Sequence, residues 1–144
     1  MAKVVKKESK WRIAAAIVGG YALIAFLIVL SEWIFGFAAP QIRTAREMPS
    51  YYFAVTGVTD SIYAFIGGYV CAKIARTAHR PAMIGLMALG EAIALYSTVL
   101  TWYTAPHTYS LALLILYPPL VWAGSWLRVR RVPVKPILVR AYGR

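Results

Sequence analysis

Charged residues, cysteines and histidines are scarce in this sequence. Of its 144 residues only 15% are charged, five are acidic, two are histidines and one is a cysteine, Cys71. A single cysteine excludes a disulfide scaffold, and a length of 144 residues predicts one domain rather than a multidomain enzyme. A soluble globular domain is usually about 25% charged, so the deficit indicates that lipid is the solvent.

Apolar residues are what the chain has in excess. Hydrophobic residues make up 60% of the sequence, and this content excludes an intrinsically disordered chain. Four runs contain no Lys or Arg and are long enough to span a hydrocarbon core of about 30 Å as helices. They are residues 13–36, 51–72, 82–103 and 109–127. We therefore predict an all-α fold, an integral membrane four-helix bundle that forms a single domain over residues 1–144.

The formal net charge of +11 is distributed unevenly between the predicted connections. Cytoplasmic connections of membrane proteins are enriched in Lys and Arg. Fourteen of the 16 basic residues fall in the N-terminal segment, in the connection between the second and third runs, or in the tail 128–144; the other two are Arg43 and Arg46. This pattern predicts a multi-pass protein of a bacterial-type cytoplasmic membrane with both termini in the cytoplasm.

The tail 128–144 is basic and directly follows the last run. Anionic lipid headgroups are the nearest polyanion, and each Lys or Arg near such a surface contributes about 1 kcal/mol of binding. We expect headgroup contacts from four of these residues, namely Arg128, Arg130, Arg131 and Lys135. Nucleic acid is the weaker interpretation of the same charges.

Three carboxylates lie inside the apolar runs, where an ionised side chain costs at least about 2.5–3.5 kcal/mol. Glu32 is close to the end of its run, so we expect it to reach the membrane interface. Asp60 and Glu91 lie deeper, at about 14 and 18 Å by helical rise, and therefore in nearly the same layer. Hydroxyl groups share the helix faces of these two acids and form the expected supporting polar face, from Thr56, Tyr63 and Thr98.

Two interpretations of Asp60 and Glu91 remain open. In the first, each carboxyl is neutral or hydrogen-bonded to a hydroxyl or a backbone carbonyl and only stabilises the bundle. In the second, the two carboxyls form a protonatable pair in a layer of low dielectric constant and exchange a proton or coordinate a cation. Because no Lys or Arg inside the four runs neutralises them, the second interpretation stays open.

Small residues and prolines predict how the helices pack. Gly57, Gly67 and Gly68 lie on the same run as Asp60, and small residues allow helices to approach closely in lipid. In the fourth run, Pro118 and Pro119 remove two amide donors, which predicts a kink and a candidate hinge. The carbonyls freed by such a kink can line a polar site, although a purely geometric kink is the interpretation we favour.

Motifs for a metal, a cofactor or a nucleotide are missing from the sequence. His79 and His107 fall in connections on opposite sides of the predicted membrane, and Cys71 has no CxxC partner. The paired glycines lie inside apolar runs without the residues of a phosphate loop. We therefore expect no metal and no cofactor, and we favour a non-enzymatic protein.

One segment carries a family resemblance. Residues 67–76, GGYVCAKIAR, resemble the GGYxxAxxA segment of small, uncharacterised multi-span bacterial membrane proteins. The segment covers ten of the 144 residues. The resemblance implies a small multi-span membrane fold and assigns no activity and no site residue.

Three functions follow from these patterns, in order of preference. Short connections and small-residue helix faces favour an accessory or scaffolding component of a homo-oligomer or a larger membrane complex. The alternative is a proton- or cation-coupled small carrier or channel that uses Asp60 and Glu91. A membrane enzyme that acts on lipid comes third, with these acids and Tyr63 as its only acid–base groups. A cavity at the two acids would favour the second function over the first.

Overall fold

Helices account for almost all of the chain that the computed structural model describes, which is residues 10–38, 50–103 and 106–131. In chain order the elements are α1 (Lys10–Ala38), α3 (Ser50–Ala75), the 3-10 helix η1 (Arg76–Ala78), α4 (His79–Leu100) and α5 (His107–Arg131). Within these ranges no residue is in a strand. The all-α fold class predicted from the apolar runs is therefore confirmed.

Three helical segments are long and apolar enough to cross a membrane. They are Lys10–Ala38, His107–Arg131 and the stretch Ser50–Leu100, in which η1 joins α3 to α4. By length and composition the chain is thus suited to be a multi-pass membrane protein.

Two helix ends differ from the boundaries expected from hydropathy. The third apolar run continues to residue 103, but α4 ends at Leu100, and the next residues form a turn that is closed by a hydrogen bond from the Thr101 N–H to the Ser97 carbonyl. The expected tail begins at residue 128, but α5 continues to Arg131. Arginine has a high helix propensity and is favoured near a helix C-terminus, so the helix outlasts the apolar run.

The connection between α3 and α4 is a tight reversal. Arg76 has φ of 54°, the only positive φ of a non-glycine residue in the part of the chain that the structure describes. Lys73 lies in the last turn of α3 and Arg80 in the first turn of α4, so the expected loop contracts to the three residues of η1. A left-handed residue at this point lets the chain turn back within one short segment.

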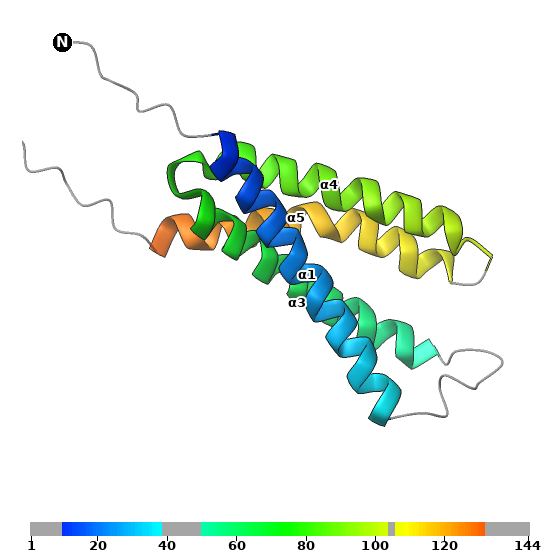
Figure 1. Cartoon of the computed structure of the whole chain (residues 1–144). Helices are drawn as coiled ribbons and strands as arrows, with labels where there is room; N and C mark the ends of the chain where they lie inside the picture. The colour runs from blue at the N-terminus through cyan, green and yellow to red at the C-terminus, as the bar shows by residue number, and fades with distance from the viewer. Residues whose placement is uncertain (1–9, 39–49, 104–105, 132–144) are drawn as a thin grey trace, which may run out of the picture.

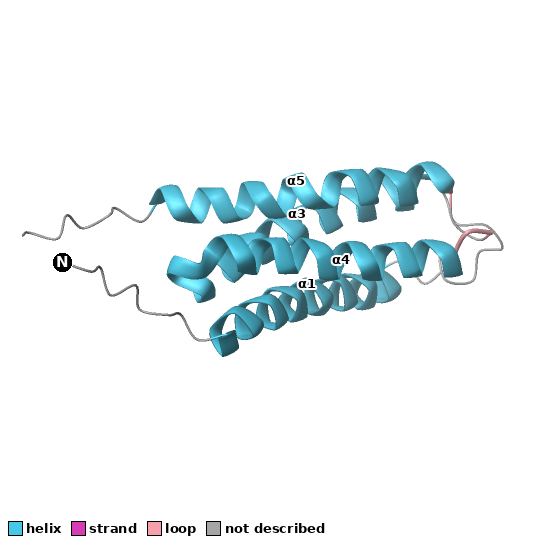
Figure 2. Ribbon diagram, turned by 90° about the horizontal axis from the view of Figure 1, so that it is seen from above, coloured by secondary structure: helices cyan, strands magenta, loops and turns pink. Residues whose placement is uncertain are grey.

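The helices lie side by side but are not parallel throughout (Figures 1 and 2). Figure 1 shows the start of α1, the end of α5 and η1 at one end of the molecule. From that end α1 and α4 diverge, while α3 and α5 remain packed against each other. The molecule is therefore closed at the end that carries η1 and opens toward the other.

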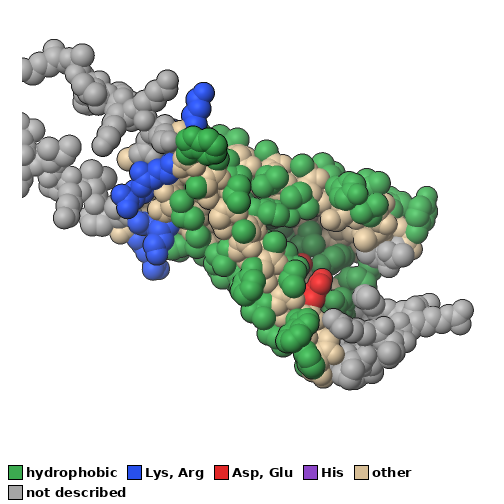
Figure 3. Space-filling view, in the orientation of Figure 1, with side chains coloured by type: hydrophobic (Ala, Val, Ile, Leu, Met, Phe, Trp, Pro, Cys, Tyr) green, Lys and Arg blue, Asp and Glu red, His purple; other side chains and the backbone are tan. Residues whose placement is uncertain are grey.

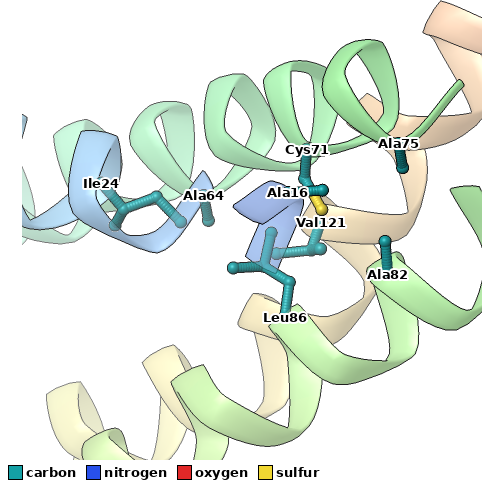
Figure 4. Close-up of a cluster of buried hydrophobic side chains, with 8 residues drawn as sticks. All are labelled: Ala16, Ile24, Ala64, Cys71, Ala75, Ala82, Leu86 and Val121. Carbon is teal, nitrogen blue, oxygen red and sulfur yellow. The ribbon is translucent and has the colours of Figure 1, made fainter. Parts of the chain in front are cut away.

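The core lies at the closed end and consists mainly of small side chains (Figure 4). Its buried members are Ala16, Ile24, Ala64, Cys71, Ala75, Ala82, Leu86 and Val121. Alanine and cysteine fill little volume, so the backbones come close and van der Waals packing replaces the missing hydrophobic drive in lipid. Figure 4 shows Cys71, Ala16 and Val121 meeting where helices cross.

Glycines allow the closest of these crossings. A Cβ atom on Gly68 would collide with the backbone of Val121, and one on Gly124 would collide with the backbone carbonyl of Phe65. α3 and α5 therefore touch backbone to backbone. Gly67 faces Ile24 of α1 with no room for a Cβ, whereas a Cβ on Gly57 would meet the Tyr109 ring at an ordinary 3.5 Å.

The two prolines do not interrupt α5. The helix runs without a break from His107 to Arg131 with Pro118 and Pro119 inside it. Val121, two residues after Pro119, is fully buried against the α3 crossing. The hinge at Pro118 and Pro119 stays a prediction.

Candidate functional site

Asp60 is placed by α3 in the middle of the bundle and is half-buried. Its Oδ2 atom accepts a hydrogen bond of 3.2 Å from the Tyr109 hydroxyl at the start of α5. The Tyr109 ring also packs against Phe53, with 5.3 Å between the ring centroids. Tyr109 thus fixes the carboxylate with a neutral donor and leaves its negative charge without a positive partner.

Asp60 faces a cleft between α1 and α4, which we call the α1–α4 cleft. The cleft has a volume of about 410 Å³, and α3 and α5 form its floor. Its polar lining comes from all of these helices and comprises Glu32, Asp60, Ser61, Ser97, Thr98, Thr101, Tyr109, Ser110, Tyr21 and Tyr117. Figure 3 shows acidic side chains at this hollow.

Glu32 is the second carboxylate of the α1–α4 cleft. Counted from the outer ends of their helices, Glu32 lies about 9 Å and Asp60 about 15 Å down, so little more than a side-chain length separates their levels. From sequence we expected Glu32 to reach the membrane interface, and we took Asp60 and Glu91 as the candidate pair.

Glu91 does not line the α1–α4 cleft. It is half-buried on α4, and its Oε1 atom is buried without a hydrogen-bond partner. Its neighbour Gly90 does line the cleft, and one residue turns a helix by about 100°. Equal depth therefore did not bring Asp60 and Glu91 into one cavity, because depth leaves the direction of a side chain around the helix open.

The three hydroxyl residues expected to support the acids have different positions. Thr98 lines the α1–α4 cleft with Asp60. The Tyr63 hydroxyl instead forms a 2.6 Å hydrogen bond with the Ser31 hydroxyl and ties α3 to α1. The Thr56 hydroxyl donates to the Tyr52 carbonyl of its own helix at 2.9 Å. Only Thr98 of these residues contributes to the cleft.

Positive charge is absent from the cleft and gathers at the other end of the described chain. No Lys or Arg of the described residues lines the α1–α4 cleft. Figure 3 shows the basic side chains at the closed end. They belong to the end of α5 and to the region around η1 and the start of α1 and comprise Lys10, Arg12, Lys73, Arg76, Arg80, Arg128, Arg130 and Arg131. The cleft is therefore a locally negative site in an otherwise basic molecule.

The arginines expected at lipid headgroups lie in the last turn of α5. The Arg130 guanidinium stacks on the Trp126 ring at 3.8 Å from its centroid, which holds the side chain beside an aromatic residue typical of the membrane interface. Lys135, the fourth expected contact, lies outside the described residues.

Gly90 and Tyr117 are among the cleft residues that the sequence analysis did not single out. A Cβ atom on Gly90 would collide with the Tyr117 ring, so this glycine makes room for Tyr117 between α4 and α5. Gly90 and Ala94 form a small-xxx-small pair, and both line the cleft, so this spacing was a usable signal. Nothing in the sequence pointed to Tyr117 as a cleft residue, because the position of its hydroxyl group depends on neighbours from other helices.

The polar side chains that line the cleft carry carboxylate and hydroxyl groups, so oxygen atoms are the ligands they offer. Within the described ranges, no group of three or more His, Cys, Asp or Glu residues lies together in a way that could hold a metal ion.

Comparisons with protein-family models, with curated proteins and with solved structures gave no match. The α1–α4 cleft, with two carboxylates and several hydroxyls, is therefore the feature from which a function can be argued.

Proposed function

We propose that the chain is a four-span bundle in a bacterial-type cytoplasmic membrane, with both termini in the cytoplasm. The stretch Ser50–Leu100 has 51 residues, and as one straight helix it would measure about 75 Å, more than twice the hydrocarbon thickness. Its reversal at η1 supports counting α3 and α4 as two spans. The basic residues at the closed end support a cytoplasmic position for that end. There Arg128, Arg130 and Arg131 would contact anionic headgroups.

In this membrane the protein acts as a small carrier or channel for protons or other cations, through the α1–α4 cleft. One observation supports this function: Glu32 and Asp60 share a cavity of about 410 Å³ that no Lys or Arg of the described helices lines. Carboxylates at membrane depth are costly unless a proton or a cation compensates them. A role limited to packing would not require an open cavity beside them.

Flux through proteoliposomes tests the function. We expect the purified protein to pass protons or sodium ions down an imposed gradient, and the variants Glu32→Gln and Asp60→Asn to lower that flux at least tenfold. Both substitutions keep the size of the side chain and remove its charge. A pH-sensitive dye and a sodium-sensitive dye inside the vesicles provide the measurement.

Glu91→Gln is the matched control, because Glu91 has the same chemistry at a similar depth but does not line the cleft. We expect this variant to retain the flux of the unmodified protein. Loss of flux in Glu91→Gln together with full flux in Glu32→Gln would contradict transport through the α1–α4 cleft. That result would instead favour transport by the pair Asp60 and Glu91. Absence of any flux would end the carrier hypothesis.

A second function, an accessory or scaffolding component that forms a homo-oligomer, is favoured by a groove on α3 and α5, which we call the α3–α5 groove. It has a volume of about 760 Å³, and its lining is mostly apolar. Small residues form part of it, namely Ala54, Gly57 and Ala112, between larger ones such as Ile62 and Leu116. A helix of a second copy would fit such a surface, because small residues permit close helix contacts in lipid.

A further inference from the structure

We propose that the α1–α4 cleft binds a small organic cation with an apolar body, rather than a bare metal ion. The proposal rests on the proposed function and names the class of substrate for the same site. Four features of the cleft carry it: its volume, its charge, its walls and its opening.

The volume fits an organic molecule. Pockets for small molecules in proteins measure about 300–1,000 Å³, and the cleft measures about 410 Å³. A Ca²⁺ ion takes about six to eight oxygen ligands at about 2.3–2.6 Å. In the part of the chain that the structure describes, two carboxylates line the cleft, and they come from different helices. The site therefore has more room and fewer charged ligands than a bare divalent ion requires.

The charge calls for a positive ligand. Glu32 and Asp60 both line the cleft, and among residues 10–38, 50–103 and 106–131 no basic side chain does. Asp60 receives only a neutral hydrogen bond, from Tyr109. A cationic headgroup between the two carboxylates would supply the missing counter-charge and reduce their mutual repulsion.

The walls fit an apolar body attached to that headgroup. Isoleucine and leucine side chains line the cleft beside the acids, among them Ile24, Ile28, Ile93 and Leu113. Tyr21 and Tyr117 add aromatic rings. Aromatic rings attract quaternary ammonium groups and other cations through their π faces. A hydrated inorganic ion would gain nothing from these walls.

The opening provides a route of entry. α1 and α4 diverge away from the closed end (Figure 1), and Figure 3 shows a hollow with acidic side chains in the described surface. A molecule with an apolar body and one positive charge partitions into the membrane interface, and this opening faces that level. Such a ligand could reach Glu32 first and Asp60 next, about 6 Å deeper.

The test measures binding of three matched probes to the full chain in lipid nanodiscs by calorimetry. Phenyltrimethylammonium carries both features, tetramethylammonium lacks the apolar body, and benzenesulfonate keeps the ring but reverses the charge. We expect phenyltrimethylammonium to bind saturably and at least tenfold more tightly than tetramethylammonium. We expect no saturable binding of benzenesulfonate.

Variants locate the binding. Glu32→Gln and Asp60→Asn should each weaken phenyltrimethylammonium binding at least tenfold, whereas Glu91→Gln should stay within twofold. Unchanged melting temperatures of these variants would exclude misfolding as the cause. Binding that is unaffected by Glu32→Gln and Asp60→Asn would overturn the proposal.

Two other outcomes separate this proposal from the proposed function. If protons or sodium ions cross proteoliposomes but phenyltrimethylammonium binds no better than tetramethylammonium, the cleft serves a simple ion and only the substrate class is wrong. If neither flux nor cation binding occurs, both proposals fail.

Discussion

A single Cβ atom would be enough to separate α3 from α5. At Gly68 the added atom would meet the backbone of Val121, and at Gly124 it would meet the backbone of Phe65. Backbone atoms cannot move aside as a flexible side chain can, so the helices themselves would have to shift. Gly57 lies on the same helix as Gly68, but there a Cβ would make an ordinary 3.5 Å contact with the Tyr109 ring.

Gly68→Ala should therefore destabilise the fold, by about 1–3 kcal/mol as expected for overpacking. Gly57→Ala should be neutral or slightly stabilising, because alanine favours a helix by about 1 kcal/mol over glycine. Unfolding in detergent, followed by tryptophan fluorescence, compares the two variants. Equal stability of both would show that the α3–α5 crossing is looser than the close contact at Val121 implies.

Among the elements, the reversal between α3 and α4 depends on one unusual backbone angle. Arg76 has φ of 54°, a region that side chains other than glycine, asparagine and aspartate rarely occupy. Ala75 before it is helical, with φ of −67°, whereas Ala78 also departs from helical geometry, with φ of −89° and ψ of 27°. The positive φ of Arg76 thus contributes to the direction of α4 relative to α3.

Replacing Arg76 by proline should disrupt this turn. Proline fixes φ near −65°, which is incompatible with the observed 54°, and we expect a loss of more than about 1 kcal/mol of stability. Arg76→Gly is the matched control, because it also removes the charge but adopts positive φ freely. Melting temperatures followed by circular dichroism should fall for the proline variant and hold for the glycine variant. A drop in both would assign the effect to the lost arginine side chain.

The whole molecule has two different surfaces. The α1–α4 cleft places the carboxyl groups of Glu32 and Asp60 among apolar side chains, whereas the α3–α5 groove is mostly apolar and, within the described residues, no charged side chain lines it. A carrier made of one chain and a scaffold made of two copies use different surfaces. The two functions therefore predict different assemblies and can be separated by measuring contact at the groove.

Cross-linking tests the assembly. Cys71 is the only cysteine and is buried, so Cys71→Ala provides a background for single cysteines. If a second copy occupies the α3–α5 groove, Ile62→Cys should form disulfide-linked dimers in native membranes. Val18→Cys is the control, since Val18 is 64% exposed, similar to the 50% of Ile62, but lies on α1 outside the groove. Equal cross-linking at both positions would indicate random collision and contradict the dimer.

The apolar runs were sufficient to predict the helices and the fold class. Length and composition alone determine whether a helix suits a hydrocarbon layer, so residues 13–36, 51–72, 82–103 and 109–127 lie almost entirely within helices. The ends were less accurate, because the helix beyond Leu127 depends on backbone hydrogen bonds rather than on hydropathy.

The three carboxylates Glu32, Asp60 and Glu91 show what the sequence could not predict. Helical rise gives the depth of Asp60 and Glu91 along their own helices, and both sequence and structure agree that Asp60 is deep. Which acids share a cavity depends on how each helix is rotated and tilted. Close contacts at Gly68, Gly90 and Gly124 determine those angles, and these contacts join residues far apart in the chain. The sequence therefore determined which residues form helices long and apolar enough to cross a membrane, whereas packing decided that Glu32, and not Glu91, lines the α1–α4 cleft with Asp60.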